Sequence, residues 1–344
     1  RNFKMNILVT GGAGFIGSNF INRILQNSNI SVANVDKLTY AGSLDSIKMA
    51  KNYKFYKVDI CDKKKIRNLI NEFKPSVIVN FAAESHVDNS IKNPLDFIET
   101  NIVGVGNLLY NSLDYYNNLS VSEKQLFKFL HISTDEVFGS LKIDEKKFSE
   151  KNKYIPSSPY AASKASSDHL VYSWYKTYGL PIIITNCSNN YGPYQYPEKL
   201  IPTMIINCIE EKKLPIYGVG ANIRDWIYVE DHCEAISQVL LKGSIGETYN
   251  IGASSEKTNN QIVNMICEIM DKKKPRKNKK SYKELIVHVD DRLGHDFRYA
   301  IDSKKIEREV GWKAKTDFKK ALDLTVQWYI DNELWWKNKI RNVI

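Results

Sequence analysis

Short apolar runs alternate with amphipathic segments along the first half of the chain. The apolar runs, each of a length that suits one buried strand, occupy residues 5–11, 31–36, 54–60, 75–83, 125–134 and 180–189. Segments with the apolar spacing of a helix lie between them, at 15–27, 62–74, 94–113 and 158–179. Nearly unbroken apolar strands that alternate with helices are typical of a parallel sheet covered on both faces. The pattern therefore predicts an α/β fold with a doubly wound parallel sheet.

The pattern changes after about residue 190. Residues 190–202 are rich in Pro, Tyr and Gly, which indicates a loop. One more short strand is predicted at 247–252, and helices are predicted at 259–272 and 317–340. We therefore predict two domains. Residues 1–188 form the first, to which the chain returns near 220–252, and residues 189–344 mainly form a smaller, mixed α/β domain.

Most of the net charge comes from one segment. Residues 272–280, KKKPRKNKK, hold seven cations and no acid, so the rest of the 344-residue chain accounts for only +3 of the net charge of +10. A solvated basic insertion explains such a run, and a patch that binds a polyanion or serves in targeting is the alternative. No nucleic-acid-binding motif accompanies the segment, so no nucleic-acid partner is expected.

The spacing of cysteines, histidines and apolar residues argues against other classes of protein. The five cysteines are scattered and odd in number, as expected for reduced thiols in a cytoplasmic protein. The six histidines lack the spacing of a zinc site, so no metal is expected. No apolar run approaches the roughly 18 residues that span a bilayer, so no membrane partner is expected. No signal peptide is visible either.

A glycine-rich segment indicates a dinucleotide site. Residues 10–18, TGGAGFIGS, place Gly11, Gly14 and Gly17 between the first predicted strand and the first predicted helix. There the glycines permit a tight turn, close approach of a pyrophosphate, and packing of helix on strand. Asp36 ends the second strand, where a carboxylate accepts from both ribose hydroxyls and repels a 2′-phosphate. The sequence thus predicts a Rossmann-type site for NAD rather than NADP; the alternative is a structural glycine turn with a capping Asp.

Two further motifs suit acid–base chemistry. The segment HISTDEVFGS puts Thr134, Asp135 and Glu136 at the end of a predicted buried strand. Two carboxylates are costly there unless they turn into water or do acid–base work in a cleft. Tyr160 and Lys164 are four residues apart on a predicted helix, hence on one face. A lysine beside a phenol lowers the pKa of the phenol, which can then take a proton from a hydroxyl that gives hydride to NAD.

These motifs resemble those of the extended short-chain dehydrogenase/reductase family, and more specifically those of dTDP-glucose 4,6-dehydratases. The similarity runs nearly end to end and is carried by TGGAGFIGSNF, NFAAESHVDNSI, ETNIVG, HISTDEVFG, SPYAASKASSDHLV, TNCSNNYGPYQYPEKLIP, LPIYGVGANIRDWIYVEDH, GETYNIG and DRLGHDFRYAID. The resemblance implies a hydro-lyase that binds NAD, forms a homodimer and acts in deoxysugar biosynthesis. Its reaction would convert dTDP-glucose to dTDP-4-keto-6-deoxyglucose by oxidation at C4, loss of water across C5 and C6, and return of hydride to C6.

The resemblance also assigns the catalytic roles. It implies that Tyr160 takes the proton of the C4 hydroxyl beside Lys164, and that Thr134 hydrogen-bonds the C4 oxygen. It further implies that Glu136 is the base at C5 and that protonated Asp135 is the acid that releases the C6 hydroxyl as water. Two neighbouring acids with opposite protonation suit a site that separates their pKa values.

Two binding sets follow from the same resemblance. The residues implied to bind the cofactor are Gly11, Gly14, Phe15, Ile16, Gly17, Asp36, Lys37, Thr39, Asp59, Ile60, Phe81, Ala82, Ala83, Ser85, Thr100, Tyr160, Lys164 and Asn190. Those implied to bind the nucleotide sugar are Ser85, His86, Thr134, Asn189, Glu198, Lys199, Leu200, Pro215, Tyr217, Arg224, Asn259, Arg292 and His295. The two arginines are the expected partners of the substrate diphosphate, because a guanidinium matches phosphate oxygens in pairs.

Three other functions remain open at this stage. They are the same chemistry on UDP-glucose or another nucleotide hexose, a sugar-nucleotide 4-epimerase, and a catalytically silent NAD-binding regulator. Related epimerases resemble the same fold but commonly carry small or hydroxyl residues where Asp135 and Glu136 stand, which argues against an epimerase. The complete set of acid, base, phenol and lysine argues against a regulator.

Overall fold

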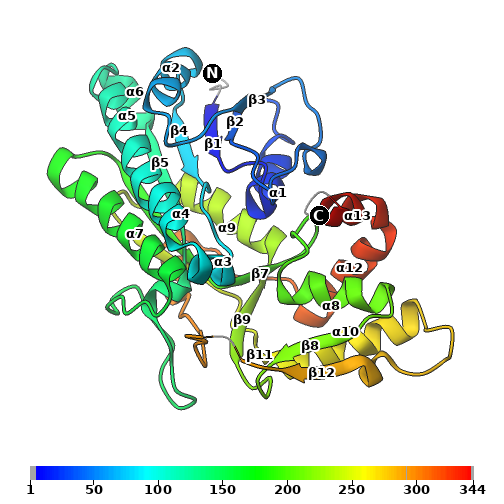
Figure 1. The fold of residues 1–344 in the computed structure, drawn as a ribbon. Helices are drawn as coiled ribbons and strands as arrows, with labels where there is room; N and C mark the ends of the chain where they lie inside the picture. Colours follow the sequence, from blue (N-terminus) through cyan, green and yellow to red (C-terminus); the bar gives the residue numbers. More distant parts are fainter. Residues whose placement is uncertain (1–4, 292, 342–344) are drawn as a thin grey trace.

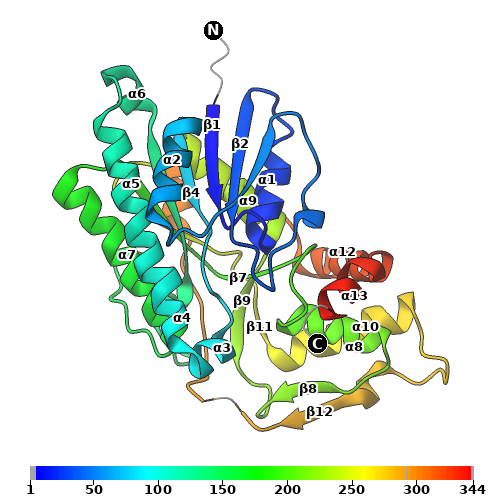
Figure 2. The ribbon, with the colours of Figure 1, turned by 45° about the horizontal axis from the view of Figure 1, so that its top comes forward.

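A seven-stranded parallel sheet forms the centre of the larger half of the protein (Figures 1 and 2). The structure is a computed structural model that describes residues 5–291 and 293–341. The strands lie in the order β10-β6-β5-β4-β1-β2-β3 and pair in parallel throughout. Their bounds are β1 Met5–Thr10, β2 Ile30–Asp36, β3 Tyr53–Lys57, β4 Val77–Asn80, β5 Lys128–Thr134, β6 Ile182–Cys187 and β10 Thr248–Ile251. The strand order reverses between β1 and β4, which is where sheets of this kind open a crevice for ligands.

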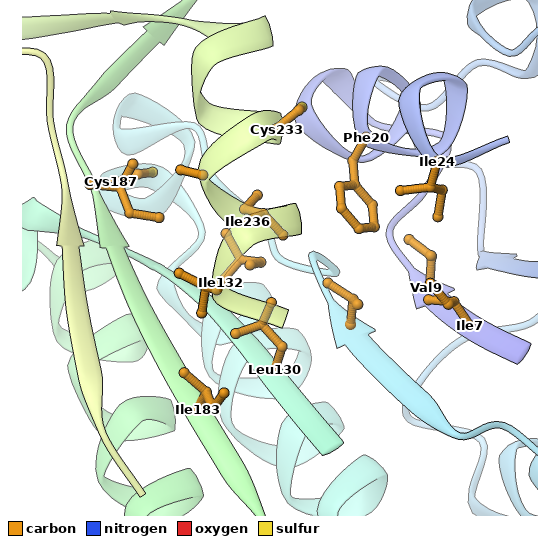
Figure 3. Packing of buried hydrophobic residues seen from close by; sticks show 14 of the residues in the cluster. Ile7, Val9, Phe20, Ile24, Leu130, Ile132, Ile183, Cys187, Cys233 and Ile236 are labelled. Atoms are coloured by element: carbon orange, nitrogen blue, oxygen red, sulfur yellow. The ribbon is translucent and has the colours of Figure 1, made fainter. Parts of the chain in front are cut away.

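Helices cover both faces of this sheet, which confirms the doubly wound α/β fold. One face is packed against α1 Phe15–Ile24, α9 Val229–Lys242 and α11 Lys304–Val310, and the other against α2 Lys63–Phe73, α5 Val105–Asn117 and α7 Pro159–Tyr178. Side chains alternate between the two cores along each strand, as the pleat requires. Ile7 and Val9 pack with Phe20 of α1 in the first core (Figure 3), whereas Leu8 lies in the second.

A smaller group of elements packs below the carboxyl edge of the large sheet (Figures 1 and 2). It contains a three-stranded sheet β11-β9-β7 and a two-stranded sheet β12-β8. Its elements are β7 Asn189–Tyr191, α8 Leu200–Ile209, β8 Leu214–Tyr217, β9 Ile223–Tyr228, β11 Glu256–Thr258, α10 Asn259–Lys273, η4 Tyr282–Leu285, β12 Ile286–Val289, α12 Phe318–Asp331 and α13 Glu333–Arg341. They share an apolar core in which Trp336 and Tyr329 are fully buried.

The division into domains stays a prediction, and the packing supports it. β10 extends the large sheet beside β6, and α9 packs against α1, so the chain does return to the large sheet within the predicted segment. The smaller group has an apolar core of its own, to which Trp226 and Tyr228 of β9 contribute, whereas Ile227 of the same strand packs in a core of the large sheet.

The structure corrects several predicted elements. The helix predicted at 94–113 is three segments, α4 Pro94–Ile98, a π-helix at Glu99–Gly104, and α5. The helix predicted at 317–340 is interrupted at Asn332, between α12 and α13. The loop predicted at 190–202 contains most of β7 and the first turn of α8, because Pro202 lies in that first turn, where a missing N–H costs no hydrogen bond. The strand predicted at 75–83 ends at Asn80. The elements that were not predicted include the short η1 Leu44–Ser46, α3 Val87–Lys92 and α6 Val121–Leu126, and, after residue 209, α9, α11, η4 and the strands β8, β9, β11 and β12.

The basic segment 272–280 lies at the end of α10 and beyond. Within it Lys274 pairs with Glu333 at 2.6 Å, Lys273 with Asp323 at 3.1 Å, and Arg276 with Glu284 at 3.5 Å. These ion pairs support a solvated insertion. Separately, none of the helices in the described residues is long and apolar enough to cross a membrane.

Candidate active site

A cleft of about 590 Å³ runs along the carboxyl edge of the large sheet and reaches the smaller group of elements. Its walls come from the loops after β1, β2, β4, β5 and β6 on one side and from α8, β8, β9 and α10 on the other. The described residues predicted to bind cofactor or substrate, or to act in catalysis, all line this cleft except Asp59 and Ile60. Arg292 lies outside the described residues. The sequence therefore identified residues that the fold brings to one place.

The glycine loop after β1 has the shape that a pyrophosphate site needs. Gly11 has a φ of +68°, and a Cβ there would lie 2.5 Å from the backbone nitrogen of Ala82. A Cβ on Gly17 would lie 2.4 Å from the carbonyl oxygen of Gly11. Helix α1 begins directly after Gly14, with no side-chain cap and no acid in its first turn. Its first N–H groups and the positive end of its dipole therefore face the cleft without a competing anion, which fits a bound dinucleotide.

The carboxylate at the end of β2 is held in a fixed orientation. Asp36 accepts hydrogen bonds from the backbone N–H of Ala13 at 3.0 Å and of Leu38 at 2.8 Å. Burial raises the pKa of Asp36, and the two N–H groups oppose that shift. Each carboxylate oxygen keeps a further acceptor site, so the pair of ribose hydroxyls expected there can be bound.

Lys37, the next residue, joins the loops around the cofactor end of the cleft. Its Nζ donates to Thr100 Oγ1 at 3.1 Å and lies 3.6 Å from Glu84 and 3.7 Å from Asp59. Thr100 therefore faces the cleft from within the π-helix. Asp59 and Ile60 do not line the cleft: Asp59 contacts Lys37, and Ile60 is buried against Gly104 of the π-helix.

At the end of β5 the three chemical side chains follow one another. Thr134 caps the short η3 helix Asp135–Phe138, because its Oγ1 accepts from the N–H of Glu136 at 3.2 Å. Asp135 is only 2% exposed, and within the described residues its Oδ2 has no hydrogen-bond partner. Burial, then the charges of Glu136 and Asp225, raise the pKa of Asp135 well above its usual value. Glu136 is only half-buried. The structure therefore favours a neutral Asp135 beside a more accessible Glu136.

The phenol and the lysine lie on the inner face of α7. Tyr160 is buried, its ring meets Phe97 edge to face, and burial and the Glu136 charge raise the pKa of its phenol, while a hydrogen bond with Thr134 opposes that shift. Lys164 is also buried, and its Nζ donates to the carbonyl oxygen of Ile132 at 2.8 Å. The pKa lowering expected from Lys164 is not among the effects that act on the phenol here.

The opposite wall supplies cations and hydrogen-bonding groups. Arg224 is buried on β9, and its guanidinium donates to the carbonyl oxygens of Ile223 at 2.8 Å, Asp296 at 2.9 Å and Phe297 at 3.3 Å. These contacts, and the ring of Tyr299 at 4.2 Å, fix the guanidinium in place. Its position in the cleft lining suits a phosphate.

Two loops meet across the cleft near its centre. Lys199 donates to the carbonyl oxygen of Ser85 at 2.9 Å, and Glu198 lies 3.7 Å from the ring of His86. The remaining predicted substrate residues lie along the wall formed by the smaller group, and they are Asn189 on β7, Leu200 on α8, Pro215 and Tyr217 on β8, Asn259 on α10, and His295, which lies 2.6 Å from Asp291. Asn190 of β7 is held by His232 of α9 at 2.8 Å.

The cleft also contains residues that the sequence did not identify. Among them are Ile132, Ser133, Cys187, Ser188, Gln195, Met204 and Trp226. Cys187 ends β6 and Ser188 follows it, so their place at the carboxyl edge of a parallel strand was the signal that could have found them. Within the described residues, no group of three or more His, Cys, Asp or Glu side chains could hold a metal ion.

Comparisons with known proteins agree with this geometry. The profile of the family described as GDP-mannose 4,6 dehydratase matches residues 8–325. A dTDP-glucose 4,6-dehydratase of Neisseria meningitidis is 52% identical over 337 residues, which cover 96% of this chain and 95% of that protein. The structure of a dTDP-glucose 4,6-dehydratase from Bacillus anthracis in complex with NAD is 46% identical, with a TM-score of 0.86 and coverage of 97% and 99% of the two chains. One from Streptomyces venezuelae, also with NAD bound, is 39% identical, with a TM-score of 0.88 and coverage of 97% and 100%.

The first prediction concerns Asp36. Replacing it in Asp36→Ala removes acceptors for the ribose hydroxyls and the charge that repels a 2′-phosphate. We expect NAD affinity to fall roughly 10- to 100-fold, the effect of about 1.5–3 kcal/mol per hydrogen bond to a charged group. The preference for NAD over NADP should fall as well. Calorimetric titration with both dinucleotides measures this, with Asp114→Ala, at a half-buried ion-pair residue outside the cleft, as the control. An unchanged preference would contradict the assignment.

Proposed function

This chain belongs to the GDP-mannose 4,6 dehydratase family, and we propose that it catalyses the NAD-dependent dehydration of dTDP-glucose to dTDP-4-keto-6-deoxyglucose. The observation that carries the proposal is the pair Asp135 and Glu136, of which the first is buried with a pKa raised well above its usual value and the second is more accessible, and both line the cleft. Dehydration needs such a pair, because one group must give a proton to the departing hydroxyl while another takes a proton from the neighbouring carbon.

The phenol of Tyr160 starts the reaction by taking the proton of the C4 hydroxyl. The phenol forms a hydrogen bond with the Thr134 side chain. The Thr134 hydroxyl is therefore placed to hydrogen-bond the C4 oxygen of the sugar as well. Bound NAD supplies the acceptor of the C4 hydride and later the donor of hydride to C6, and the positive charge of its oxidised ring would lower the pKa of a phenol beside it. Residues of the glycine loop, Asp36 and the Lys37 cluster hold this cofactor.

The two acids then act at neighbouring carbons. The ketone at C4 makes the C5 hydrogen acidic, and Glu136 removes it as a proton. Asp135, held neutral by burial, gives its proton to the C6 hydroxyl, which leaves as water. The proton on Glu136 returns to C5 when hydride reaches C6. The cofactor ends as it began, so the reaction needs no external redox partner.

The nucleotide end of the substrate occupies the wall formed by the smaller group. Arg224 binds the diphosphate, aided by Arg292, and Lys199 and Asn189 reach toward the sugar. Pro215, Tyr217 and His295 surround the base. This arrangement makes the smaller group the nucleotide-sugar domain and the large sheet the NAD domain.

Two alternatives differ in the substrate or in the reaction. The same chemistry on UDP-glucose or another nucleotide hexose would use the same catalytic residues, and the named dTDP-glucose dehydratases to which the chain is similar favour thymidine. A 4-epimerase has no water to expel and therefore no use for a buried neutral acid at Asp135.

A homodimer is the proposed assembly. Large apolar side chains are exposed along the adjacent helices α4, α5 and α7 and the π-helix between them, namely Leu95, Ile98, Val103, Tyr110 and Tyr172. Contiguous exposed apolar residues on a soluble protein mark an interaction surface. All five cysteines are free thiols, which supports a reducing cytoplasm as its location.

A substrate panel tests the reaction. The protein is incubated with dTDP-, UDP-, CDP- and GDP-glucose, and the products are weighed by mass spectrometry. We expect loss of one water, fastest with dTDP-glucose, and no loss with Tyr160→Phe. If another of the four nucleotide sugars is converted faster, that nucleotide sugar replaces dTDP-glucose as the proposed substrate. An unchanged mass with appearance of the 4-epimer would replace the dehydratase by an epimerase.

Separate variants of the two acids test their roles. Asp135→Asn should slow the loss of water by roughly 10²–10⁴-fold while oxidation at C4 is less affected, so reduced cofactor should accumulate and be visible by stopped-flow absorbance. Glu136→Gln should block entry of solvent deuterium at C5. The exposed neighbour Asp144→Asn is the control. If Asp135→Asn slows both steps equally, Asp135 is not the acid.

A single charge should break the proposed dimer. Val103→Glu would bury an unpaired carboxylate in the interface, which is costly. Light scattering during size-exclusion chromatography should show a dimer for the unchanged protein and a monomer for the variant. Leu324→Glu places the same charge at a similarly exposed position on α12 and should leave the dimer intact. A variant that stays dimeric would place the interface elsewhere.

A further inference from the structure

A line of buried polar side chains lies beneath the catalytic edge and is not used by the reaction described above. It begins at Thr10 of β1, whose Oγ1 donates to Asn80 Oδ1 at 2.6 Å. The amide nitrogen of Asn80 lies 3.0 Å from Nδ1 of His131 on β5. Nε2 of His131 lies 3.3 Å from Oδ1 of Asp168 on α7 and 3.2 Å from the hydroxyl of Ser167. This series of buried side chains ends at Asp168, which is 2% exposed.

The hydrogen bonds fix the protonation of His131. The carbonyl oxygen of the Asn80 side chain accepts from Thr10, so its amide nitrogen is turned toward the imidazole and donates to Nδ1. The ring proton therefore sits on Nε2, on the side of Asp168. Burial, and then the charge of Lys164, lower the pKa of His131 to about 4. At neutral pH the imidazole carries no charge.

Among the titratable groups that the structure describes around the Lys164 ammonium, Asp168 is the one that can balance its positive charge. The titratable side chains that interact electrostatically with the ammonium are Asp168 on its own helix, His131 on β5 and Cys187 on β6. Burial raises the pKa of the Cys187 thiol to about 12 and also raises that of the phenol, so both are neutral, as is the imidazole. Burial lowers the pKa of Lys164, and the charge of Asp168 opposes that shift.

The same carboxylate fixes the strands that carry the catalytic segment. Its Oδ2 accepts from Ser133 Oγ at 2.8 Å and lies 3.3 Å from Nδ2 of Asn186. Ser133 precedes the catalytic segment on β5, and Asn186 of β6 also donates to the carbonyl oxygen of Thr134 at 3.0 Å. Tyr160, Lys164 and Asp168 are spaced four residues apart, so one face of α7 is joined directly to the end of β5.

We propose that Asp168 is a positioning residue for this reaction: it is the buried acid one turn along α7 from the buried Lys164 and serves as the counter-ion of that ammonium, and it locks the end of β5 against α7 so that Tyr160 and the Thr134–Glu136 segment meet on one hexose. The proposal rests on the dehydration proposed above. An ammonium buried without its counter-ion costs several kcal/mol and sheds its proton more readily. Misplacement of reacting groups by about 1 Å can cost on the order of 100-fold in rate.

The test uses Asp168→Asn, which keeps the shape and removes the charge. We expect kcat to fall roughly 10- to 100-fold at neutral pH. Because the variant Lys164 loses its proton at lower pH, the alkaline fall of the kcat profile should move to lower pH. Asp168→Glu, which restores the charge, should return the alkaline limb toward its original position. The matched control is Asp231→Asn, another buried acid that accepts three hydrogen bonds but lies outside the cleft. It should change thermal stability without moving the profile.

A second measurement needs no turnover and therefore separates the two proposals. The titration of Lys164 is followed by nuclear magnetic resonance in protein labelled with ¹³C-lysine, and the signal is assigned with Lys164→Arg. A lower midpoint in Asp168→Asn supports the counter-ion even if none of the four nucleotide hexoses is dehydrated. An unchanged midpoint, or a kcat profile that moves equally in Asp231→Asn, overturns it.

A variant that leaves the charge in place tests the positioning role. Ser133→Ala removes one hydrogen bond to the carboxylate, so kcat should fall while the Lys164 midpoint stays. This variant also serves if Asp168→Asn does not fold. An unchanged kcat in Ser133→Ala would overturn the role of Asp168 in locking the strand end.

Discussion

Removal of water from the carboxyl edge of β5 is the constraint on which the site depends. Asp135, Tyr160 and Lys164 are almost entirely buried, and each therefore has its pKa displaced toward its neutral form. Such burial costs free energy, because the charged forms lose their hydration. The apolar cores on both faces of the sheet stabilise the fold enough to offset that cost. The same burial leaves Asp135 able to give a proton at neutral pH. The burial that destabilises the folded protein is therefore also what makes Asp135 an acid for the reaction.

The π-helix at Glu99–Gly104 shows how the fold aims side chains at this edge. Two consecutive polar side chains of this turn, Thr100 and Asn101, are buried. Asn101 bonds both backbone groups of Glu84 and the hydroxyl of Ser163, one turn from Tyr160. Thr100 meets Lys37. One irregular turn thus joins the loop after β4, the cofactor end of the cleft and the catalytic helix.

The sequence predicts what is encoded locally and misses what depends on partners. The glycine loop, the strand ends and the i, i+4 pair of Tyr160 and Lys164 each follow from a short motif, and the structure brings them together. The π-helix escaped prediction because the apolar spacing of 94–113 continues through it, and the break at Asn332 carries no Pro or Gly to mark it. The expected lowering of the Tyr160 pKa assumed that the Lys164 ammonium contacts the phenol. In the structure the ammonium donates to the carbonyl oxygen of Ile132 instead. From the sequence alone, Asp168 cannot be told from any other polar residue on a helix, because its hydrogen-bond partners lie on β5 and β6, far away in the sequence.

Asp135 and Asp168 show why residue type alone could not settle the roles. Both are aspartates, both are 2% exposed, and both lie within the reach of β5 and α7. Asp168 receives hydrogen bonds from Ser133 and Asn186 at Oδ2, and its charge opposes the lowering of the Lys164 pKa by burial. Burial and the charges of Glu136 and Asp225 raise the pKa of Asp135 well above its usual value, which favours retention of its proton. Identical side chains a few ångströms from the same strand end are thereby given opposite charge states by donors and neighbouring charges, and the division between counter-ion and acid follows from that difference.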